Sequence, residues 1–543
     1  MSLKVYFNGK IICVDKDNTV EEAIIVENGI IQAVGSNEDM IQEAYHRSSE
    51  VEEINLKGKT MLPGFIDSHG HIVAIAQSSM MINFGETTSR EEMVEQLTVY
   101  LKENPRSEGK WLLGLGYDNS KFEDGKHPNK FDLDKVSTEV PIFITHASGH
   151  IAATNSKALE LFGYVGEDYV VPEGGVVQTV ENSREPIGVL EETAFLDESK
   201  KSCIGAPGFE DVLAALEKAQ DLYASYGITT AQDASVDKGM HQLLGAAAQY
   251  GKLKLDIVGY AIQPFTKELM GENSSFDAKY FNHYKLLGGK TWLDGSPQAK
   301  TAWLTKPYHV VPEGEKEDYC GYGTQPDEVV TAYFKTCIEN NYQVNAHCNG
   351  DAASDQFIRC YKNALEATGN KEDLRPVMVH CQTVREDQLD AMQSIGMLPT
   401  FFLDHIFYWG DYHHDSVLGP ERAQRISPAG SALKRGMNFT LHQDPPVKMP
   451  IMTLAIHNAV NRMTQGGRVL GEDQRISVMD AIRAVTINGA HQYFEENTKG
   501  SLEVGKVADL VILDKCPILV ESDELKDIKV IETIKDGNTI YKA

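Results

Sequence analysis

The stretch Met61-Leu-Pro-Gly-Phe-Ile-Asp-Ser-His-Gly-His71 decides the fold and the chemistry that we expect of this chain. An apolar run ends in two histidines, His69 and His71, with one residue between them. In a β-strand, residues two apart point to the same face, so both imidazoles would leave the strand end together. Neutral imidazole is the commonest side-chain metal ligand, so the stretch predicts half of a metal site. Two ordinary histidines are the alternative, and the rest of the chain has to decide between them.

Further short β-rich runs follow this stretch, and helical patterns lie between most of them. The runs are 228–233, 255–262, 290–294, 343–347, 376–380, 398–403 and 438–442. Eight strands that alternate with helices predict an α/β protein with a (β/α)8 TIM-type barrel. An open, doubly wound sheet is the structural alternative. Candidate ligands at the ends of many different strands favour the barrel, because only a closed sheet brings all those ends around one axis.

Two additions to the barrel are predicted. The segments 1–62 and 498–543 both read as short strands with turn signals at Asn8-Gly9, Asn28-Gly29 and Asp536-Gly537, so we expect them to pair into one small β-sandwich. The barrel domain would then span 63–497. Within it, the stretch from His71 to Ile228 is too long for one helix and its loops, so we expect an inserted α+β subdomain at about 80–205, above the active-site mouth.

Polar side chains that suit a metal stand at several predicted strand ends. His347 closes Val-Asn-Ala-His, His380 closes Val-Met-Val-His, and Asp444 follows the last strand. Lys290 is a weaker candidate, since it opens its run rather than closing it. Four histidines and an aspartate are too many for a closed structural zinc site, which takes four ligands. They suit a site with an open position, or two metal ions.

Composition and charge narrow the class of protein. The chain of 543 residues has 42% hydrophobic and 24% charged residues, as a globular protein does. Its net charge of −28 argues against nucleic acid or an anionic membrane as a partner. No apolar run is long enough to span a membrane, no secretory signal is evident, and the eight cysteines are scattered. We expect a cytoplasmic protein with reduced thiols that acts on a small molecule; a homodimer is allowed.

A family resemblance covers essentially the whole chain. The motifs that carry it are residues 63–71, Gly227-Ile-Thr-Thr, Asp294-Gly-Ser296, His347, His380, Gly419-Pro-Glu-Arg422, Asp444-Pro-Pro-Val447 and Gly505-Lys-Val-Ala-Asp-Leu-Val511, with Gly149-His150 and Asn155-Ser-Lys-Ala-Leu159 in the insertion. Together they resemble the amidohydrolase superfamily, specifically its amidohydrolase 3 or YtcJ-like branch. The combination is specific for the branch and not for a substrate.

The resemblance implies a metal-dependent hydrolase that cleaves a non-peptide carbon–nitrogen bond, such as an N-substituted amide or a formamide. The histidines 69, 71, 347 and 380 would bind one or two divalent ions, with Zn²⁺ the first expectation, and Asp444 would be ligand and general base. A metal lowers the pKa of water, and a carboxylate beside that water can take its proton. We also expect Lys290 to be carbamylated and to bridge two metals, because a free lysine beside cations is repelled. A lysine that pairs with Asp294 or contacts the substrate is the alternative.

The substrate pocket has five candidates. His150, His405 and Arg422 are candidates by family position, and Asp118 comes from the insertion. His442 stands two residues before Asp444, where the family usually has a small residue, so it narrows the pocket, hydrogen-bonds Asp444 or simply packs.

Two other functions compete with the hydrolase. A deaminase of the same fold would use one metal and a glutamate near the strand-5 histidine; residue 350 is glycine, which weakens this option. A non-catalytic regulatory protein that kept the barrel is the other, and the intact ligand set argues against it. Metal content and a panel of N-acyl amines would separate the three.

Overall fold

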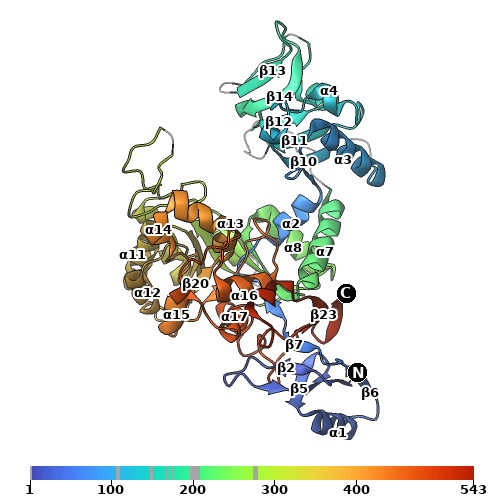
Figure 1. Cartoon of the computed structure of the whole chain (residues 1–543), viewed down its shortest axis with the longest axis vertical. Helices are drawn as coiled ribbons and strands as arrows, with labels where there is room; N and C mark the ends of the chain where they lie inside the picture. The colour runs from blue at the N-terminus through green and yellow to red at the C-terminus, as the bar shows by residue number, and fades with distance from the viewer. Residues whose placement is uncertain are drawn as a thin grey trace. The chain divides into compact units, whose positions relative to one another are not determined.

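A computed structural model describes residues 3–105, 110–146, 151–166, 168–172, 175–195, 208–272, 279–312 and 314–543 (Figure 1). The chain forms two compact units, one of residues 1–74 and 217–543 and the other of residues 75–216. These two units do not test the predicted boundaries at 62/63, 497/498 and about 80 and 205, which remain predictions. No helix among the described residues is both long and apolar enough to cross a membrane.

The larger unit contains the predicted barrel sheet. Its eight strands follow one another in chain order: β8 (Phe65–Ile66), β15 (Ile228–Val236), β16 (Asp256–Ile262), β17 (Tyr284–Trp292), β18 (Gln343–Cys348), β19 (Val377–His380), β20 (Leu398–Phe401) and β21 (Thr440–Leu441). Every neighbouring pair is parallel. No ladder joins β8 to β21 among the described residues, but Ser68 Oγ, just after β8, donates to Leu441 O at 3.1 Å. The predicted α/β TIM-type fold is confirmed.

Helices lie between the barrel strands along the chain and also follow the last of them (Figure 1). They are α2 (Ile72–Ser79), α7 (Phe209–Ser225), α8 (Lys238–Gln249), α9 (Thr266–Glu272), α10 (Asp327–Glu339), α11 (Asp351–Thr368), α12 (Glu386–Gln393), α13 (Asp404–Tyr412), α14 (Gly419–Ala423), α15 (Ala429–Lys434), α16 (Met452–Asn461), α17 (Val478–Ala484) and α18 (Ile487–Gln492). Several start where the sequence supplies an N-cap: the Asp237 side chain accepts from Met240 N at α8, and Ser477 accepts from Asp480 N at α17.

The first apolar run divides at Gly64. The residues before it form β7 (Thr60–Pro63), which pairs with strands of a terminal sheet, and only β8 belongs to the barrel. A Cβ atom at Gly64 would lie 2.4 Å from the side chain of Thr229, so the chain passes between the two sheets at a residue without a side chain.

Two sheets are built from the ends of the chain. One has the order β5 (Ile30–Gly35), β4 (Ala23–Glu27), β1 (Leu3–Phe7), β6 (Val51–Asn55), and α1 (Asn37–Arg47) connects β5 to β6; the other runs β24 (Asn538–Lys542), β23 (Val530–Lys535), β22 (Leu510–Leu513), β7, β2 (Lys10–Ile12), β3 (Val20–Glu21). Tyr6 and Ile24 of the first sheet share a buried cluster with Met61 and Ile512 of the second. The hairpins predicted at 28–29 and 536–537 are present. The hairpin predicted at Asn8-Gly9 does not form, because β1 and β2 lie in different sheets; that prediction was wrong.

The smaller unit is built on its own mixed sheet. The order is β13 (Gly175–Thr179), β14 (Pro186–Glu192), β12 (Ile151–Thr154), β11 (Ile142–His146), β10 (Leu112–Tyr117), β9 (Ile82–Asn83), with helices α3 (Arg90–Glu103), α4 (Lys130–Leu133) and α5 (Ser156–Phe162). Alternate strand residues face opposite sides, so Ile142 and Ile144 pack with Leu97 of α3, whereas Phe143 packs with Leu159 of α5. The sheet therefore has an apolar cluster on each face.

Candidate metal centre

Histidine, lysine and aspartate side chains meet at the carboxyl ends of the barrel strands. Asp444 is central: its Oδ1 lies 3.3 Å from His71 Nε2 and 3.5 Å from His69 Nε2, and its Oδ2 lies 3.9 Å from His380 Nε2. Lys290 Nζ lies 3.5 Å from His69 Nε2. The ligand atoms of His69, His380 and Asp444 all lie within 4.8 Å of one another, and no other such group of three occurs among the described residues.

His347 joins this cluster from β18. The centre of its ring lies 4.7 Å from that of His380, and the rings meet edge to face. The strand register explains why the two rings are close. His347 pairs with Trp292 of β17, and His380 pairs with Cys348, the residue after His347. The prediction that strand ends gather these side chains thus agrees with their positions, while their roles remain predictions.

Lys290 and the paired histidines reach the site differently from the sequence prediction. Strand β17 begins at Tyr284 and ends at Trp292, so Lys290 lies near the end of its strand instead of opening it. His69 and His71 lie beyond the end of β8, in the loop that follows it. The loop still brings both imidazoles to Asp444.

Hydrogen bonds at Nδ1 orient the imidazoles. Gln232 donates from Nε2 to Ser68 O at 2.7 Å, which leaves its Oε1 to accept from His69 Nδ1 at 2.9 Å. The carboxylate of Asp294 lies 3.2 Å from His347 Nδ1 and accepts from it in the same way. With the proton on Nδ1, the Nε2 lone pair of each ring can serve as a metal ligand. In this structure His347 Nε2 lies 3.2 Å from Asn349 Nδ2, so a metal at His347 would replace that contact.

The charge states of these groups suit a divalent cation. Burial lowers the pKa of His69 and of His380 well below the ordinary value, so both rings are neutral and can act as ligands. Burial raises the pKa of Asp444, but the contact with His71 and the electrostatic attraction of His71, His442 and Lys290 together outweigh burial and lower it, so the carboxylate is ionised. Its Oδ1 is buried and lacks a well-formed hydrogen bond within the described part of the chain. Neutral nitrogen donors around such an oxygen fit Zn²⁺ or a similar ion.

Two of the site residues adopt left-handed backbone conformations. His380 has φ 68° and Asp444 has φ 54°, values that cost non-glycine residues about 1–3 kcal/mol each. The segment with Asp444 is held by its neighbours: His71 N donates to Pro445 O at 2.9 Å, and Gln443 Nε2 donates to Asp404 Oδ2 at 3.3 Å. Strain concentrated at converging polar side chains is typical of a functional site.

The five predicted pocket residues have different surroundings. His405 is buried with its ring centre 6.0 Å from that of His380, so it lies beside the centre. Arg422 donates to the carbonyl oxygens of Leu418, Lys306 and Pro307 and lines a separate cavity of about 310 Å³. Asp118 belongs to the smaller unit, where its Oδ1 lies 4.0 Å from His146 Nε2. His150 lies outside the described residues. His442 contacts His380 and Thr400.

Three polar residues of the site were not assigned roles from the sequence. Gln232 and Thr400 point into the barrel from β15 and β20, and Asp294 follows β17. A polar residue within an otherwise apolar barrel strand is the signal that would have singled out the first two.

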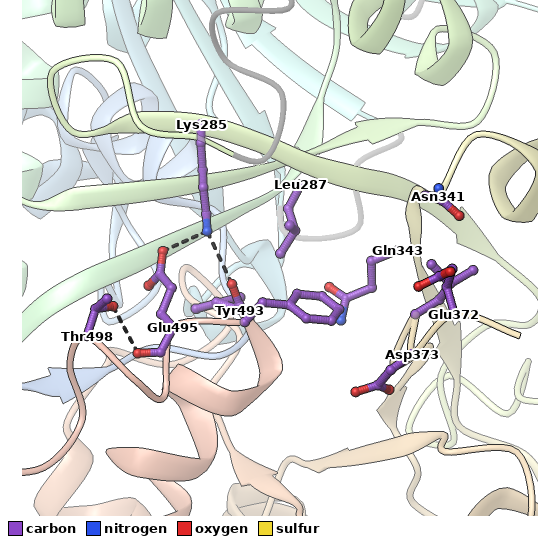
Figure 2. A pocket seen from close by; sticks show the side chains of 11 residues that line it. Lys285, Leu287, Asn341, Gln343, Glu372, Asp373, Tyr493, Glu495 and Thr498 are labelled. Carbon is purple, nitrogen blue, oxygen red and sulfur yellow. Dashed lines mark hydrogen bonds and ion pairs between the residues drawn. The ribbon is translucent and has the colours of Figure 1, made fainter.

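Figure 2 shows a second cavity of the larger unit, with a volume of about 430 Å³. Its walls come from the start of β17 and β18, where Lys285 and Gln343 lie, and from the segment after α18. Lys285 Nζ donates to Glu495 Oε1 at 2.6 Å and to Tyr493 O at 3.2 Å. The cavity is therefore at the amino ends of the strands, opposite Lys290 and His347, and it is not part of the metal centre.

Comparisons with known proteins agree with this geometry. The sequence profile of the Amidohydrolase family matches residues 52–541, so the chain belongs to that family. It is 25% identical to the putative amidohydrolase YtcJ of Bacillus subtilis, over 99% of both chains, and 25% identical to the N-substituted formamide deformylase of Arthrobacter pascens, over 98% of this chain and 97% of the relative.

A solved structure shares the fold. The crystal structure of an uncharacterized metal-dependent hydrolase from Pyrococcus furiosus superposes with a TM-score of 0.77 at 23% identity, covering 95% of this chain and all of that one. Family membership makes the protein a hydrolase of the amidohydrolase class, and the superposition shows the same fold.

Proposed function

We propose that the protein hydrolyses a non-peptide carbon–nitrogen bond of a small molecule, of the amide or formamide type, with Zn²⁺ or a similar ion held by His69, His71, His347, His380 and Asp444. The observation that carries the proposal is the Asp444 carboxylate, which is ionised, has its Oδ1 buried, and lies between the Nε2 atoms of three histidines. A bound divalent ion supplies a Lewis acid that polarises a carbonyl oxygen and lowers the pKa of water.

Asp444 is the proposed proton carrier. Its two oxygens face different histidines, so one can serve as a ligand while the other accepts a proton from the attacking water. The same carboxyl group then donates the proton to the leaving nitrogen, which departs as a neutral amine. With Nδ1 of His69 and His347 protonated and hydrogen-bonded, and Nε2 committed to the ion, neither ring would have a free lone pair to compete for this proton.

Lys290 is proposed to become a carbamate that bridges two ions. Burial lowers its pKa to about 7, so a large share of the amine is neutral near neutral pH. The neutral nitrogen can bond to the carbon of carbon dioxide and release one proton, which replaces a buried cation by an anion. Lys290 Nζ lies 3.5 Å from His69 Nε2, so a carbamate on this nitrogen would add an anionic ligand beside the candidate metal-binding histidines.

The substrate class is the finer part of the proposal. Support comes from the name of the relative in Arthrobacter pascens, an N-substituted formamide deformylase, at 25% identity. His405 lies beside the centre and is proposed to contact the substrate, with His150 and Asp118 as further candidates from the insertion.

The structure disfavours a deaminase. The glutamate that this reaction needs near the strand-5 histidine would stand at Gly350, and a Cβ atom there would lie 1.8 Å from Trp303 O. An acidic side chain cannot occupy that position unless the backbone moves.

Asp444→Asn tests the proposal. The variant should keep most of its bound metal and lose about 10²–10⁴-fold in turnover of N-formyl and N-acyl amines, the usual contribution of a general base. The exposed carboxylate of Asp411 provides the control, since Asp411→Asn should leave both quantities unchanged. Near wild-type turnover in Asp444→Asn with unchanged metal content would assign the proton to another group, and wild-type protein without stoichiometric metal would remove the proposal altogether.

A further inference from the structure

A chain of hydrogen bonds (the file) runs through the barrel interior, from His380 through His442 and Thr400 to Ser68. His380 Nδ1 lies 3.1 Å from His442 Nε2, and His442 Nδ1 lies 2.9 Å from Thr400 Oγ1. Thr400 Oγ1 lies 3.2 Å from Ser68 Oγ, which lies 3.1 Å from Leu441 O. All four side chains are buried. The file therefore connects three barrel strands and the loop that carries His69.

The carbonyl oxygen of Leu441, at the end of the file, fixes which atom donates and which accepts in each hydrogen bond. A carbonyl oxygen can only accept, so the Ser68 hydroxyl donates its one proton to Leu441 O. Ser68 Oγ must then accept from the Thr400 hydroxyl, and Thr400 Oγ1 in turn accepts from His442 Nδ1. A neutral His442 with its proton on Nδ1 has a bare Nε2, which accepts from His380 Nδ1.

His380 is thereby left with one arrangement. Its proton is on Nδ1, and its Nε2 lone pair points toward Asp444, whose Oδ2 is 3.9 Å away. The opposite arrangement would place the proton of His380 on the nitrogen that faces the metal. We propose that His442 is a positioning residue that, through this file, fixes the tautomer and ring orientation of His380 for metal binding.

Packing supports a role beyond space filling. The His442 ring lies against Phe402 with the ring centres 5.3 Å apart and an angle of 28° between the planes, so the direction of both ring nitrogens is defined. His442 does not bond Asp444, one of the roles predicted from the sequence, because its two nitrogens already face His380 and Thr400. Partners of this kind orient metal-bound histidines in general.

The test measures Zn²⁺ affinity by competition with a chromophoric chelator, together with the absorption spectrum of the Co²⁺ form. His442→Met removes the acceptor for His380 while keeping an apolar side chain of similar length, and His442→Gln keeps an acceptor within reach. The matched control is His241→Met. His241 lies on α8, outside the file; it is also buried, and its Nδ1 lies 3.0 Å from Tyr284 Oη. Thr400→Val keeps the volume and cuts the file one step further out.

We expect His442→Met to bind Zn²⁺ about 10–100-fold more weakly and to shift the Co²⁺ spectrum, as is usual when a partner of a ligand is lost. His442→Gln should stay within about threefold of wild type, His241→Met should match wild type, and Thr400→Val should lose about threefold or more.

Wild-type affinity in His442→Met, or equal losses in His442→Met and His442→Gln, would overturn the inference. If His442→Met does not fold, Thr400→Val decides, and unchanged affinity in that variant overturns the file. The inference rests on the proposed metal site, and the two fail differently: a wild-type protein that binds no Zn²⁺ refutes the site, whereas variants that bind as well as wild type refute only the role of His442.

Discussion

Asp256 of β16 is the centre of a buried ion cluster that joins the barrel to the six-stranded terminal sheet. Its carboxylate contacts the ammonium groups of Lys499 and of Lys535, the latter at 3.1 Å, and lies 2.8 Å from His283 Nδ1. Lys535 belongs to β23. Asp256→Asn keeps the shape of the side chain and removes its charge, so it isolates the electrostatic contribution.

The structure sets the size of the effect. Removing one partner of a buried ion pair costs about 3–5 kcal/mol, because the other charge stays buried. Lys499 keeps Glu495 at 3.2 Å, and Lys535 keeps Asp509 at 3.2 Å, so we expect the lower end, about 3 kcal/mol.

That free energy converts to a melting temperature. The larger unit has roughly 400 residues, which gives an unfolding entropy of about 0.8 kcal/mol/K. The Tm of Asp256→Asn should therefore fall by about 4 °C.

The pH dependence follows from the pKa of Asp256. Burial raises this pKa, and the charges of Lys499 and Lys535 outweigh burial, so it lies below the ordinary value. A carboxylate with a lowered pKa stabilises the fold above the pKa of the unfolded chain, about 4, and loses that contribution as the pH falls further. The difference in Tm between wild type and variant should thus be constant from about pH 8 to about pH 5 and shrink below about pH 4.

Calorimetry or circular dichroism on the metal-loaded protein measures both effects. The control is Asp221→Asn, which breaks an exposed pair with Lys254 and should shift Tm by no more than about 1 °C. A shift in Asp256→Asn no larger than in the control would show that the cluster is fully compensated by solvent or by its other members.

Three further predictions concern the site and its supports. Bicarbonate should increase metal uptake by wild type and not by Lys290→Met, more strongly above about pH 7 than below it, because burial lowers the pKa of Lys290 to about 7; labelled bicarbonate and carbon NMR would detect the carbamate. Gly350→Ala should lower both Tm and metal affinity, since its Cβ atom would lie 1.8 Å from a carbonyl oxygen. Gly271→Ala should lower neither, because a Cβ atom there would meet no atom within 4 Å from another part of the described chain. Asp118→Asn should raise KM about tenfold at unchanged metal content if the carboxylate binds substrate, and an unchanged KM would remove it from the pocket.

Local patterns predicted the barrel, and they predicted which candidate ligand side chains come together at the ends of its strands. An apolar run that ends in histidine, as at His347 and His380, contains both the strand and its functional end within a few residues. Which strands pair with each other could not be predicted as well, because strand pairing depends on distant parts of the chain. The turn signal at Asn8-Gly9 is real, yet the strands on its two sides find their partners elsewhere.

The predicted strand at Lys290 started six residues too late, because β17 begins at Tyr284. Gly288 and Gly289 interrupt the apolar pattern before Lys290, so the predicted run began too late. In the barrel a Cβ atom at Gly288 would lie 2.0 Å from Gln343 O, and one at Gly289 would lie 2.1 Å from the hydroxyl of Tyr333. The glycines are required by neighbours that no local pattern reveals. The partner of His442 was missed for the same reason, because it belongs to another strand.

The passage through Gly64 has a consequence for the order in which the protein is made. Strand β7 lies between β2 and β22, and one residue later the chain enters the barrel. Ribosomes deliver β22 only after every barrel strand has been synthesised, so until then β7 presents an unpaired edge. The loop with His69 and His71 follows that incomplete sheet. We therefore expect nascent chains arrested before β22 to acquire metal poorly, and assembly of the centre to be among the last events of biogenesis.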